Sequence, residues 1–196
     1  MPRLFVATTN RHKLEEIHSL LIGAPVNFVA LDEFPPMQEP EETGETFEAN
    51  ARLKAKYYAE ATQLCTVAED SGLEIDALGG EPGVRSARFL RPDASYAERF
   101  DDILRRLADR PGEPRTARFV CAIAVVRDGT VAFEARGTIG GEIALAPRGT
   151  NGFGYDPIFY YPPYGCTLAE VTRADKLRVA HRGRAFRALA DWLRNL

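Results

Sequence analysis

Residues 3–21, RLFVATTNRHKLEEIHSLL, decide the fold class of this chain. Residues 3–8 are short, mostly apolar and end in polar side chains, which favours a buried strand. The polar segment TTNRHK follows, and Leu14, Ile17 and Leu21 then recur at the spacing of one helix face. A strand that leads through a polar loop into a helix is the repeating unit of α/β proteins.

The next segment continues this pattern with a strand, a loop and a helix. VNFVAL, residues 26–31, predicts a second strand, and residues 32–45 are rich in Pro, Gly and acidic residues, which predicts a loop. Thr46 can cap the start of a long helix. The apolar residues of that helix recur at spacings of four, four and three: Phe47, Ala51, Ala55 and Tyr58.

Further along, the pattern changes to a meander of strands that ends in a helical tail. TVAED, residues 66–70, predicts a strand that stops at a Ser71-Gly72 turn, and residues 95–110 predict an amphipathic helix capped by Ser95. Asp128-Gly129 lies between two apolar segments and predicts a hairpin. Because both parallel and antiparallel pairings are needed, we expect an α/β fold with a mixed β-sheet flanked by helices.

Composition excludes several classes of protein. The 196 residues include 45% hydrophobic and 27% charged residues, and the net charge is -3, which indicates a globular chain without the basic excess of a nucleic-acid binder. No apolar run approaches the roughly 18 residues that cross a bilayer. The three cysteines are far apart and odd in number, so we expect reduced thiols and a cytoplasmic location.

The loop from Thr8 to Lys13 is the first candidate site. Its six residues (Thr8, Thr9, Asn10, Arg11, His12 and Lys13) lie where a predicted strand ends and a helix begins. Free N–H groups, the helix dipole and the Lys13 charge suit a polyphosphate. The alternative is an ordinary helix cap followed by a surface lysine. The loop lacks the glycines of a Walker A motif.

Carboxylates at the end of the predicted strand 66–70 form the second candidate site. Successive strand residues point to opposite faces, so only one of Glu69 and Asp70 can face a given cleft, and Asp70 is the better candidate. Asp70 could hold Mg²⁺ or activate a water molecule. A loop glutamate, Glu41 or Glu42, could complete the metal site. The alternatives are an Asx turn at Asp70 and solvated glutamates.

Two further clusters follow in the second half of the chain. In Gly152-Phe153-Gly154-Tyr155-Asp156-Pro157 the glycines allow close approach of a ligand, and Phe153 or Tyr155 could stack on a base. On one straight helix, Lys176 and His181 would lie about 140° apart. Either the helix breaks between them or they serve different parts of one ligand. His181 and Arg182 could donate to a base edge.

Five strings in a fixed order give these fragments a common meaning. TTNRHK, EETGETFEANARLKA, AEDSGLEIDALGGEPGVRSARF, GTNGFGYDPIF and LAEVTRADKLRVAHRGRA closely resemble the inosine/xanthosine triphosphate pyrophosphatase family. The resemblance extends from about Leu4 to about Leu193. It implies one nucleoside triphosphate pyrophosphatase domain over residues 1–196, with an elongated mixed sheet and two lobes around a central active-site cleft. It also implies a homodimer.

The resemblance assigns roles to residues at matching positions. Asp70 resembles the catalytic base that also contacts Mg²⁺, and Glu41 resembles the second metal-associated carboxylate, with its neighbour Glu42 as the alternative. Thr8 to Lys13 resemble the phosphate loop. The remaining positions resemble substrate contacts: Ser71, Phe153, Gly154, Tyr155, Asp156, Lys176, His181 and Arg182. The chain departs from the family pattern at Glu69, Leu177 and Ala180.

The expected reaction is hydrolysis of ITP, dITP and XTP to the monophosphate and pyrophosphate, with water near Asp70 attacking the α-phosphorus. Mg²⁺ is the expected cofactor, and neither nucleic acid nor membrane is an expected partner. Donors from His181 and Arg182 would favour bases with a keto group at position 6. Two alternatives remain at this point: a pyrophosphatase for other nucleotides, and a non-catalytic nucleotide sensor.

Overall fold

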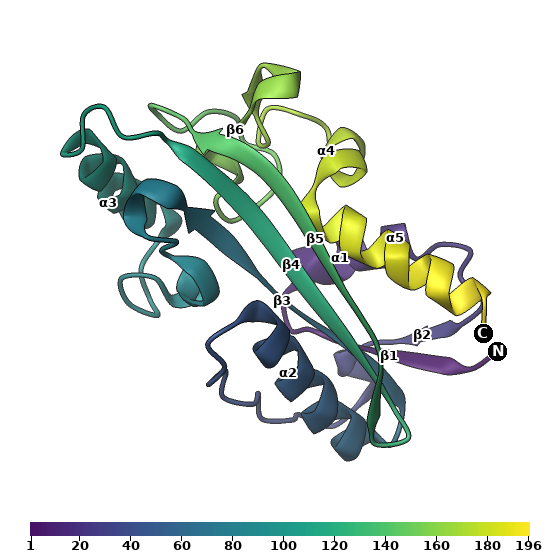
Figure 1. The fold of residues 1–196 in the computed structure, drawn as a ribbon. Coiled ribbons are helices and arrows are strands. Elements are labelled where there is room, and N and C mark those ends of the chain that lie inside the picture. The colour runs from purple at the N-terminus through teal and green to yellow at the C-terminus, as the bar shows by residue number, and fades with distance from the viewer. The chain divides into compact units, whose positions relative to one another are not determined.

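The computed structural model describes residues 1–196 as a mixed α/β fold (Figure 1). Strand order in the sheet is β2-β1-β3-β4-β5-β6-β7. The strands are β1 (Arg3–Ala7), β2 (Asn27–Val29), β3 (Cys65–Ile75), β4 (Thr116–Arg127), β5 (Thr130–Ile143), β6 (Phe159–Tyr161) and β7 (Cys166–Thr167). The helices are α1 (Arg11–Leu20), α2 (Phe47–Thr62), α3 (Tyr96–Ala108), α4 (Arg173–Val179) and α5 (His181–Arg194). Short 3₁₀ turns, η1 to η5, lie at 31–33, 76–78, 83–88, 156–158 and 162–164.

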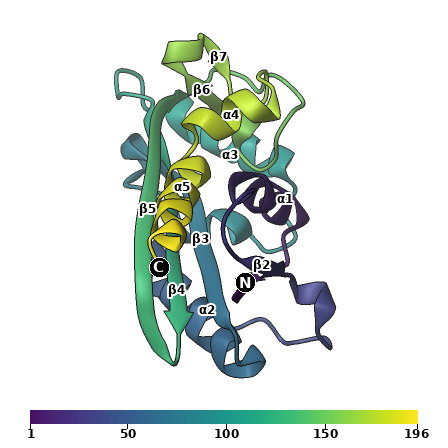
Figure 2. The same cartoon turned by 90° about the vertical axis from the view of Figure 1, so that its right-hand side faces the viewer.

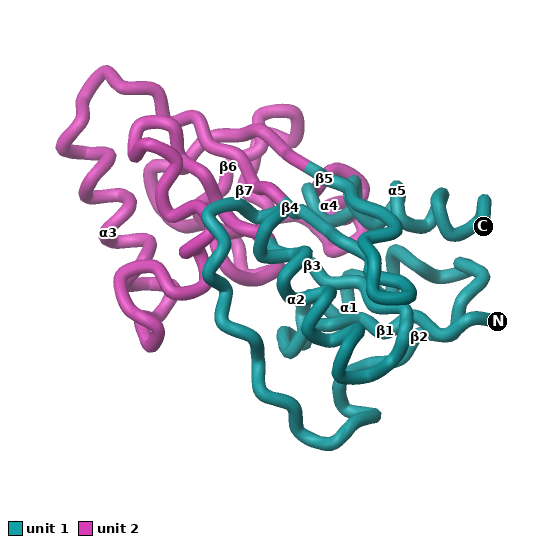
Figure 3. The backbone as a smooth tube through the Cα atoms, turned by 60° about the horizontal axis from the view of Figure 1, so that its bottom comes forward, with its two compact units in different colours: residues 1–70, 121–137, 181–196 teal, residues 71–120, 138–180 magenta.

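The chain divides into two compact units (Figure 3). Unit 1 comprises residues 1–70, 121–137 and 181–196, and unit 2 comprises residues 71–120 and 138–180. Each unit buries its own apolar cluster. The strands β3, β4 and β5 contribute residues to both units, so the divisions follow packing and not the ends of elements.

Unit 1 is built around β1, which pairs in parallel with both β2 and β3. Alternate residues of β1 face opposite layers: Leu4 and Val6 join the cluster with α1 and α5, whereas the Phe5 ring lies 5.8 Å from the Tyr58 ring of α2. The views in Figures 1 and 2 show the two chain termini close together beside α5. This α-β-α layering places helix N-termini beside the end of β1.

Unit 2 has a separate core under α3. Phe100, Ile103 and Leu107 of α3 pack with strand residues such as Ile139 and Phe159. The sheet continues by antiparallel pairing of β5 with β6 and of β6 with β7. The cap of α3 matches its sequence signature, because Ser95 and Glu98 form a reciprocal capping box.

Most predicted elements are confirmed. Asn10 and Thr46 cap α1 and α2, and the apolar positions foreseen on α2 are buried. The hairpin at Asp128-Gly129 joins β4 to β5 with positive φ at both residues, as a type I′ turn requires. The second strand is shorter than expected, since η1 already begins at Leu31.

The predicted turn at Ser71-Gly72 was wrong. β3 runs without interruption from Cys65 to Ile75, and Gly72 is not among the glycines with positive φ. Ser-Gly is turn-prone locally, but β3 is an inner strand of the sheet. Its pairing with β1 ends at Ala68, while β4 lies on its other side and favours continued extended structure. Asp70 therefore lies inside a continuous strand and not at its end. None of the helices is long and apolar enough to span a membrane.

Candidate functional site

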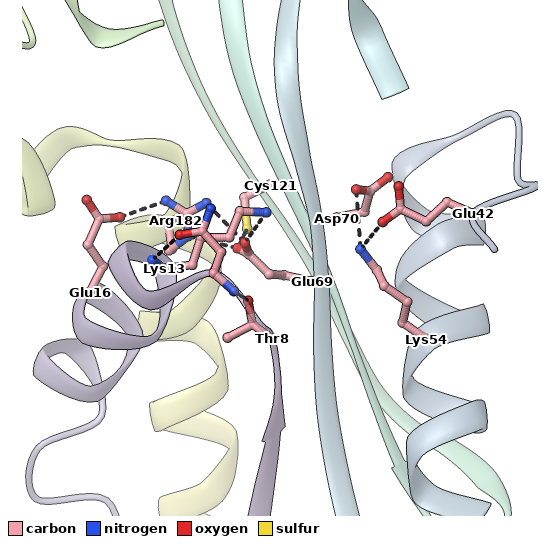
Figure 4. Close-up of polar contacts among 10 residues, drawn as sticks. Thr8, Lys13, Glu16, Glu42, Lys54, Glu69, Asp70, Cys121 and Arg182 are labelled. Atoms are coloured by element: carbon pink, nitrogen blue, oxygen red, sulfur yellow. Dashed lines mark hydrogen bonds and ion pairs between the residues drawn. The ribbon is translucent and has the colours of Figure 1, made fainter. Parts of the chain in front are cut away.

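Two adjacent carboxylates on β3 face opposite sides of the strand, as its period of two requires (Figure 4). Glu69 is 3% exposed and Asp70 is 5% exposed. Asp70 faces α2, whereas Glu69 faces α1 and the start of α5. All of these partners belong to unit 1. Neighbouring positions in the sequence thus build two separate charged clusters.

The first cluster, the Asp70 cluster, comprises Asp70, Asn50, Lys54 and Glu42. The Asn50 amide donates to Asp70 at 3.0 Å, and the Lys54 ammonium lies 3.4 Å from Asp70 Oδ1 and 2.5 Å from Glu42 Oε1. Asn50 and Lys54 are four residues apart on α2, so they share the helix face that packs against β3. Two carboxylates therefore converge on one positive charge.

Burial sets the protonation behaviour of this cluster. It raises the pKa of Asp70 above its ordinary value, and the nearby Glu42 charge acts in the same direction while Lys54 opposes it. Burial alone would lower the pKa of Lys54, but Asp70 and Glu42 outweigh it and the net pKa is raised. The lysine therefore stays charged, and Asp70 is a stronger proton acceptor than an exposed aspartate.

The second cluster, the Glu69 cluster, comprises Glu69, Arg182, Lys13, Glu16 and Cys121. Arg182 donates to both oxygens of Glu69, through Nε at 2.8 Å and Nη2 at 3.0 Å, and through Nη1 to Glu16 at 2.7 Å. Lys13 Nζ lies 2.8 Å from Glu69 Oε1, and the Cys121 thiol donates to Oε2 at 3.0 Å. Two acids and two bases balance in charge within it.

Charge balance explains how these groups stay ionised while buried. Burial alone would raise the pKa of Glu69, but Arg182 and Lys13 together hold it well below its usual range. The pKa of Arg182 is raised because Glu69 and Glu16 outweigh its burial, and burial raises that of the Cys121 thiol well above normal. The four charged groups therefore favour their ionised forms, and the Cys121 thiol keeps its proton and donates a hydrogen bond to Glu69.

The phosphate loop predicted from the sequence follows β1 and opens α1. The Asn10 side chain accepts from the Lys13 backbone N–H at 3.1 Å, and Thr8 Oγ1 accepts from the Asn10 N–H at 3.2 Å. Thr9, Arg11 and the other outer residues of the loop are exposed. The first turn of α1 therefore presents its N-terminus and the partly exposed Lys13 side chain to solvent.

Unit 2 brings together most of the other predicted residues. Asp156 accepts from the Phe153 backbone N–H at 2.9 Å and from Lys176 Nζ at 2.6 Å, and that ammonium lies 4.5 Å from the centre of the Phe153 ring. Gly154 has a φ of +65°, which allows the loop to close. Tyr155 is buried, and its hydroxyl donates to the Ser86 carbonyl at 2.8 Å.

The helix does break between Lys176 and His181. α4 ends at Val179, Ala180 is extended with φ −66° and ψ 156°, and α5 begins at His181. Lys176 belongs to unit 2, whereas His181 and Arg182 belong to unit 1. Ser71, the first residue of unit 2, is partly buried within β3. The first of the two alternatives for this pair is therefore the correct one.

Arg182 differs from the expectation of a donor available to a base. Its side chain is 1% exposed, and Nε, Nη1 and Nη2 all donate to Glu69 or Glu16. These partners lie 113 and 166 positions away in the sequence, so no local pattern could reveal them. A direct contact with a base would have to exchange one of these charge-assisted hydrogen bonds.

Three residues of these two clusters are not among the predicted site residues: Asn50, Lys54 and Glu16. Asn50 is completely buried and Lys54 faces Asp70, so a polar pair at spacing four lies next to the apolar stripe of α2. Two polar residues at this spacing beside an apolar helix face indicate a buried polar site, and this signal is present in the sequence. The sequence left open whether Glu41 or Glu42 joins Asp70. Lys54 contacts both Glu42 and Asp70, whereas Glu41 is exposed.

The donor set of the Asp70 cluster fits a magnesium ion held together with a substrate. No group of three or more His, Cys, Asp or Glu side chains that could hold a metal ion is present. Mg²⁺ is usually held by one or two carboxylates, with phosphate oxygens and water completing its shell. Asp70 and Glu42 supply two carboxylates that already face one cation, Lys54.

The mixed sheet flanked by helices places the chain among the α/β proteins. More narrowly, it belongs to the Ham1 family, whose model matches residues 4–192. It is 46% identical over 193 residues to a dITP/XTP pyrophosphatase of Geobacter sulfurreducens, covering 98% of this chain and 97% of the relative.

Solved structures agree with this assignment. A HAM1 protein from Coxiella burnetii superposes with a TM-score of 0.93 at 40% identity, and all of both chains is covered. A protein from Mycobacterium abscessus, described as a nucleoside-triphosphatase and dITP/XTP pyrophosphatase, has a TM-score of 0.77 at 42% identity, covering 95% of this chain and 98% of that one. The α/β class and the mixed β-sheet flanked by helices that we expected from the sequence are confirmed.

Proposed function

We propose that this chain hydrolyses non-standard purine nucleoside triphosphates, namely ITP, dITP and XTP, to the monophosphate and pyrophosphate. Relatives at 42% to 48% identity are dITP/XTP pyrophosphatases, and they match over nearly the whole chain. The observation that carries the proposal is the convergence of Asp70 and Glu42 on one cation, in the unit that also presents the α1 N-terminus. Residues 1–196 would act as one functional domain.

The candidate site residues of unit 1 would each have a defined role in the reaction. The N-terminus of α1 and the residues Thr8 to Lys13 bind the triphosphate, since free N–H groups and a positive charge favour phosphate. Asp70 accepts a proton from the water that attacks the α-phosphorus, for which its raised pKa suits it. Lys54 neutralises charge on the phosphates and orients Asp70.

Asp70 and Glu42 are the residues that would hold magnesium. When bound, Mg²⁺ would supply charge neutralisation at the phosphate oxygens. Asp70 would serve both the metal and the attacking water, which suits a carboxylate with several lone pairs. Asn50 fixes its orientation through the 3.0 Å hydrogen bond.

Both units contain residues that we propose as purine contacts. In unit 2, Phe153 offers an aromatic face, and Gly154, Tyr155, Asp156 and Lys176 surround it or support it. Ser71, the first residue of unit 2, is a further proposed substrate contact. In unit 1, His181 and Arg182 are the candidate donors to a keto group of the base. Matching such a donor to an acceptor, instead of facing an amino group, favours one base by about 1–3 kcal/mol.

The direct test is pyrophosphate release from ITP, XTP, dITP, GTP and ATP, with Mg²⁺ and with a chelator. We expect strong Mg²⁺-dependent release from the first three and little from the other two. Release of orthophosphate alone would place the cut at another phosphorus and contradict the mechanism. No turnover of any substrate would favour a nucleotide sensor.

An Asp70→Asn variant tests the assignment of the base. It keeps the shape of the side chain but cannot accept the proton, and we expect kcat to fall by roughly 10²–10⁴-fold, the usual contribution of a general base. Glu41→Gln is the matched control for Glu42→Gln, since the two lie side by side in one loop. Equal Mg²⁺ dependence in both variants would remove Glu42 from the metal site.

A cytoplasmic location, a homodimer and removal of deaminated purines from the nucleotide pool belong to the same proposal. They follow from the chemistry of the proposed substrate and from the family resemblance. Sedimentation of the purified protein would test the dimer, and mutation frequency in cells lacking the protein would test its role in the nucleotide pool.

A further inference from the structure

Arg99 is a buried arginine that no carboxylate neutralises. It lies on α3 in unit 2 and is 3% exposed. Its Nη1 donates to the Ser86 carbonyl at 3.4 Å, its guanidinium lies 4.9 Å from the centre of the Tyr96 ring, and its Nε has no hydrogen-bond partner. Arginine is rarely buried without a carboxylate, because desolvation of the charge is costly. The buried charge of Arg99 is therefore balanced by no carboxylate and is held only by a carbonyl and an aromatic ring.

The carbonyl that Arg99 contacts is shared with Tyr155. The Tyr155 hydroxyl donates to it at 2.8 Å, and burial raises the pKa of Tyr155, so the hydroxyl keeps its proton and remains a donor. Ser86 is itself fixed, because its Oγ donates to the Gly83 carbonyl at 2.6 Å and accepts from the Leu73 N–H at 2.9 Å. Two donors from different segments therefore meet at one immobile acceptor.

Tyr155 belongs to the loop that carries the proposed purine contacts. On the other side of this residue, Asp156 binds both the Phe153 N–H and Lys176, and Lys176 lies against the Phe153 ring. Tyr96, in the first turn of α3, packs edge-on against the Tyr155 ring with centroids 5.3 Å apart. The first turn of α3, which carries Tyr96 and leads to Arg99, thus packs against Tyr155 of the loop 152–156.

We propose that Arg99 is a positioning residue for the loop 152–156: with Tyr155 it anchors this loop to the Ser86 carbonyl, so that Phe153 and Lys176 are held ready for the purine. This inference rests on the proposed function for its consequence in catalysis. Its structural part, the anchoring of the loop, stands separately. Arg99 does not touch the reacting phosphorus in this scheme, so its loss weakens substrate binding more than it slows the chemical step.

The experiment compares Arg99→Met, Tyr155→Phe and the double variant with the wild-type chain. For ITP with Mg²⁺ we expect KM to rise roughly fivefold to tenfold in each single variant, as loss of one hydrogen bond predicts, with kcat changing less than KM. Amide hydrogen exchange of residues 150–158 is expected to accelerate in the same variants. Because both side chains act at one carbonyl, the double variant should be little worse than the worse single variant.

Ile103→Val is the matched control, since Ile103 is fully buried on the same helix but its side chain has no donor for the Ser86 carbonyl. It should lower stability without changing KM or loop exchange. Arg99→Lys retains a hydrogen-bond donor, so its KM should lie between that of Arg99→Met and that of the wild type. The proposal is overturned if Arg99→Met exchanges like the wild type, or if Ile103→Val reproduces its effects.

The two proposals fail in different ways. If the wild-type chain releases no pyrophosphate from ITP, the proposed function falls, and hydrogen exchange still decides whether Arg99 anchors the loop. If the wild type turns over ITP but Arg99→Met leaves KM and exchange unchanged, only the positioning role falls.

Discussion

Each unit of the molecule buries one arginine, and the two arginines are treated very differently. In unit 1, Arg182 is 1% exposed and donates to Glu69 and Glu16. In unit 2, Arg99 is 3% exposed and meets a main-chain carbonyl and an aromatic ring, with its Nε unsatisfied. The first charge is fully compensated within its unit, whereas the second is not.

The difference shows that burial of a charge has two separate meanings. A compensated network such as the Glu69 cluster depends on all of its members, because removing one leaves another charge buried without a partner. An uncompensated charge has no such dependants, so its removal relieves a cost. The stability of unit 1 should therefore depend strongly on Arg182, and the stability of unit 2 should depend only weakly on Arg99.

The largest expected effect comes from replacing Arg182 by methionine, with the same replacement of Arg99 as its comparison. Arg182→Met leaves Glu69 and Glu16 without their main partner and should reduce the free energy of unfolding by about 3–5 kcal/mol. Arg99→Met removes a poorly satisfied charge and should change it by no more than about 1 kcal/mol. Urea denaturation of both variants measures this contrast.

Equal losses in the two variants would break the comparison. A combined Arg182→Met and Glu69→Gln variant serves as a control, because removing the opposite charge as well should recover part of the loss. Without recovery, the loss would be due to packing and not to charge.

A second test asks whether the Glu69 cluster depends on the place where α5 begins. A Cβ at Gly137 would lie 2.0 Å from the His181 carbonyl oxygen and 2.8 Å from the Ala185 nitrogen, so Gly137→Ala must displace α5. We expect a loss of about 1–3 kcal/mol, the usual cost of overpacking. Gly140→Ala on the same strand is the control, since no atom lies within 4 Å of its Cβ.

Thermal unfolding of both glycine variants checks this prediction. A Gly137→Ala protein as stable as Gly140→Ala would mean that α5 can shift freely, and that Arg182 reaches Glu69 from more than one helix position.

The smallest expected effect concerns the exposed cap of α3, the helix that carries Arg99. Arg91 and the Ser95 cap lower the pKa of Glu98 to about 2, from an ordinary value of 4.5. Because the pKa of Glu98 is lower in the folded state, its ionised carboxylate stabilises the fold at pH values above 4.5. This stabilisation disappears as the pH falls from 4.5 towards about 2. The Tm difference between the wild type and Glu98→Gln should therefore shrink over this range.

Because the pair is exposed to solvent, this difference should also decrease at high salt. A pH-independent difference would show that the hydrogen bonds of the cap, and not its charge, are what matters.

Local elements of the fold could be predicted because their signals are local. The caps at Thr46 and Ser95, and the Asp128-Gly129 hairpin, depend on residues a few positions apart. The turn at Ser71-Gly72 failed because the place of β3 inside the sheet overrides a weak local preference. The break at Ala180 was left open, since it depends on how α4 and α5 each pack.

The candidate site was predictable in its residues more than in its contacts. Asp70 was identified from strand alternation, but the bond of Arg182 to Glu69 joins positions 113 apart, and no periodicity encodes it. Lys54 was missed because a lysine on a helix is usually solvated. The choice between Glu42 and Glu41 needed the path of the loop against α2.

Strand alternation at positions 69 and 70 has an evolutionary consequence. Glu69 and Asp70 are neighbours in the chain, yet they face different helices and share no partner among Asn50, Glu42, Arg182 and Glu16. A substitution at one codon can therefore be selected for its own surroundings while the other stays constant. An insertion or deletion of a single codon just before the pair would instead exchange their surroundings and disable both clusters at once.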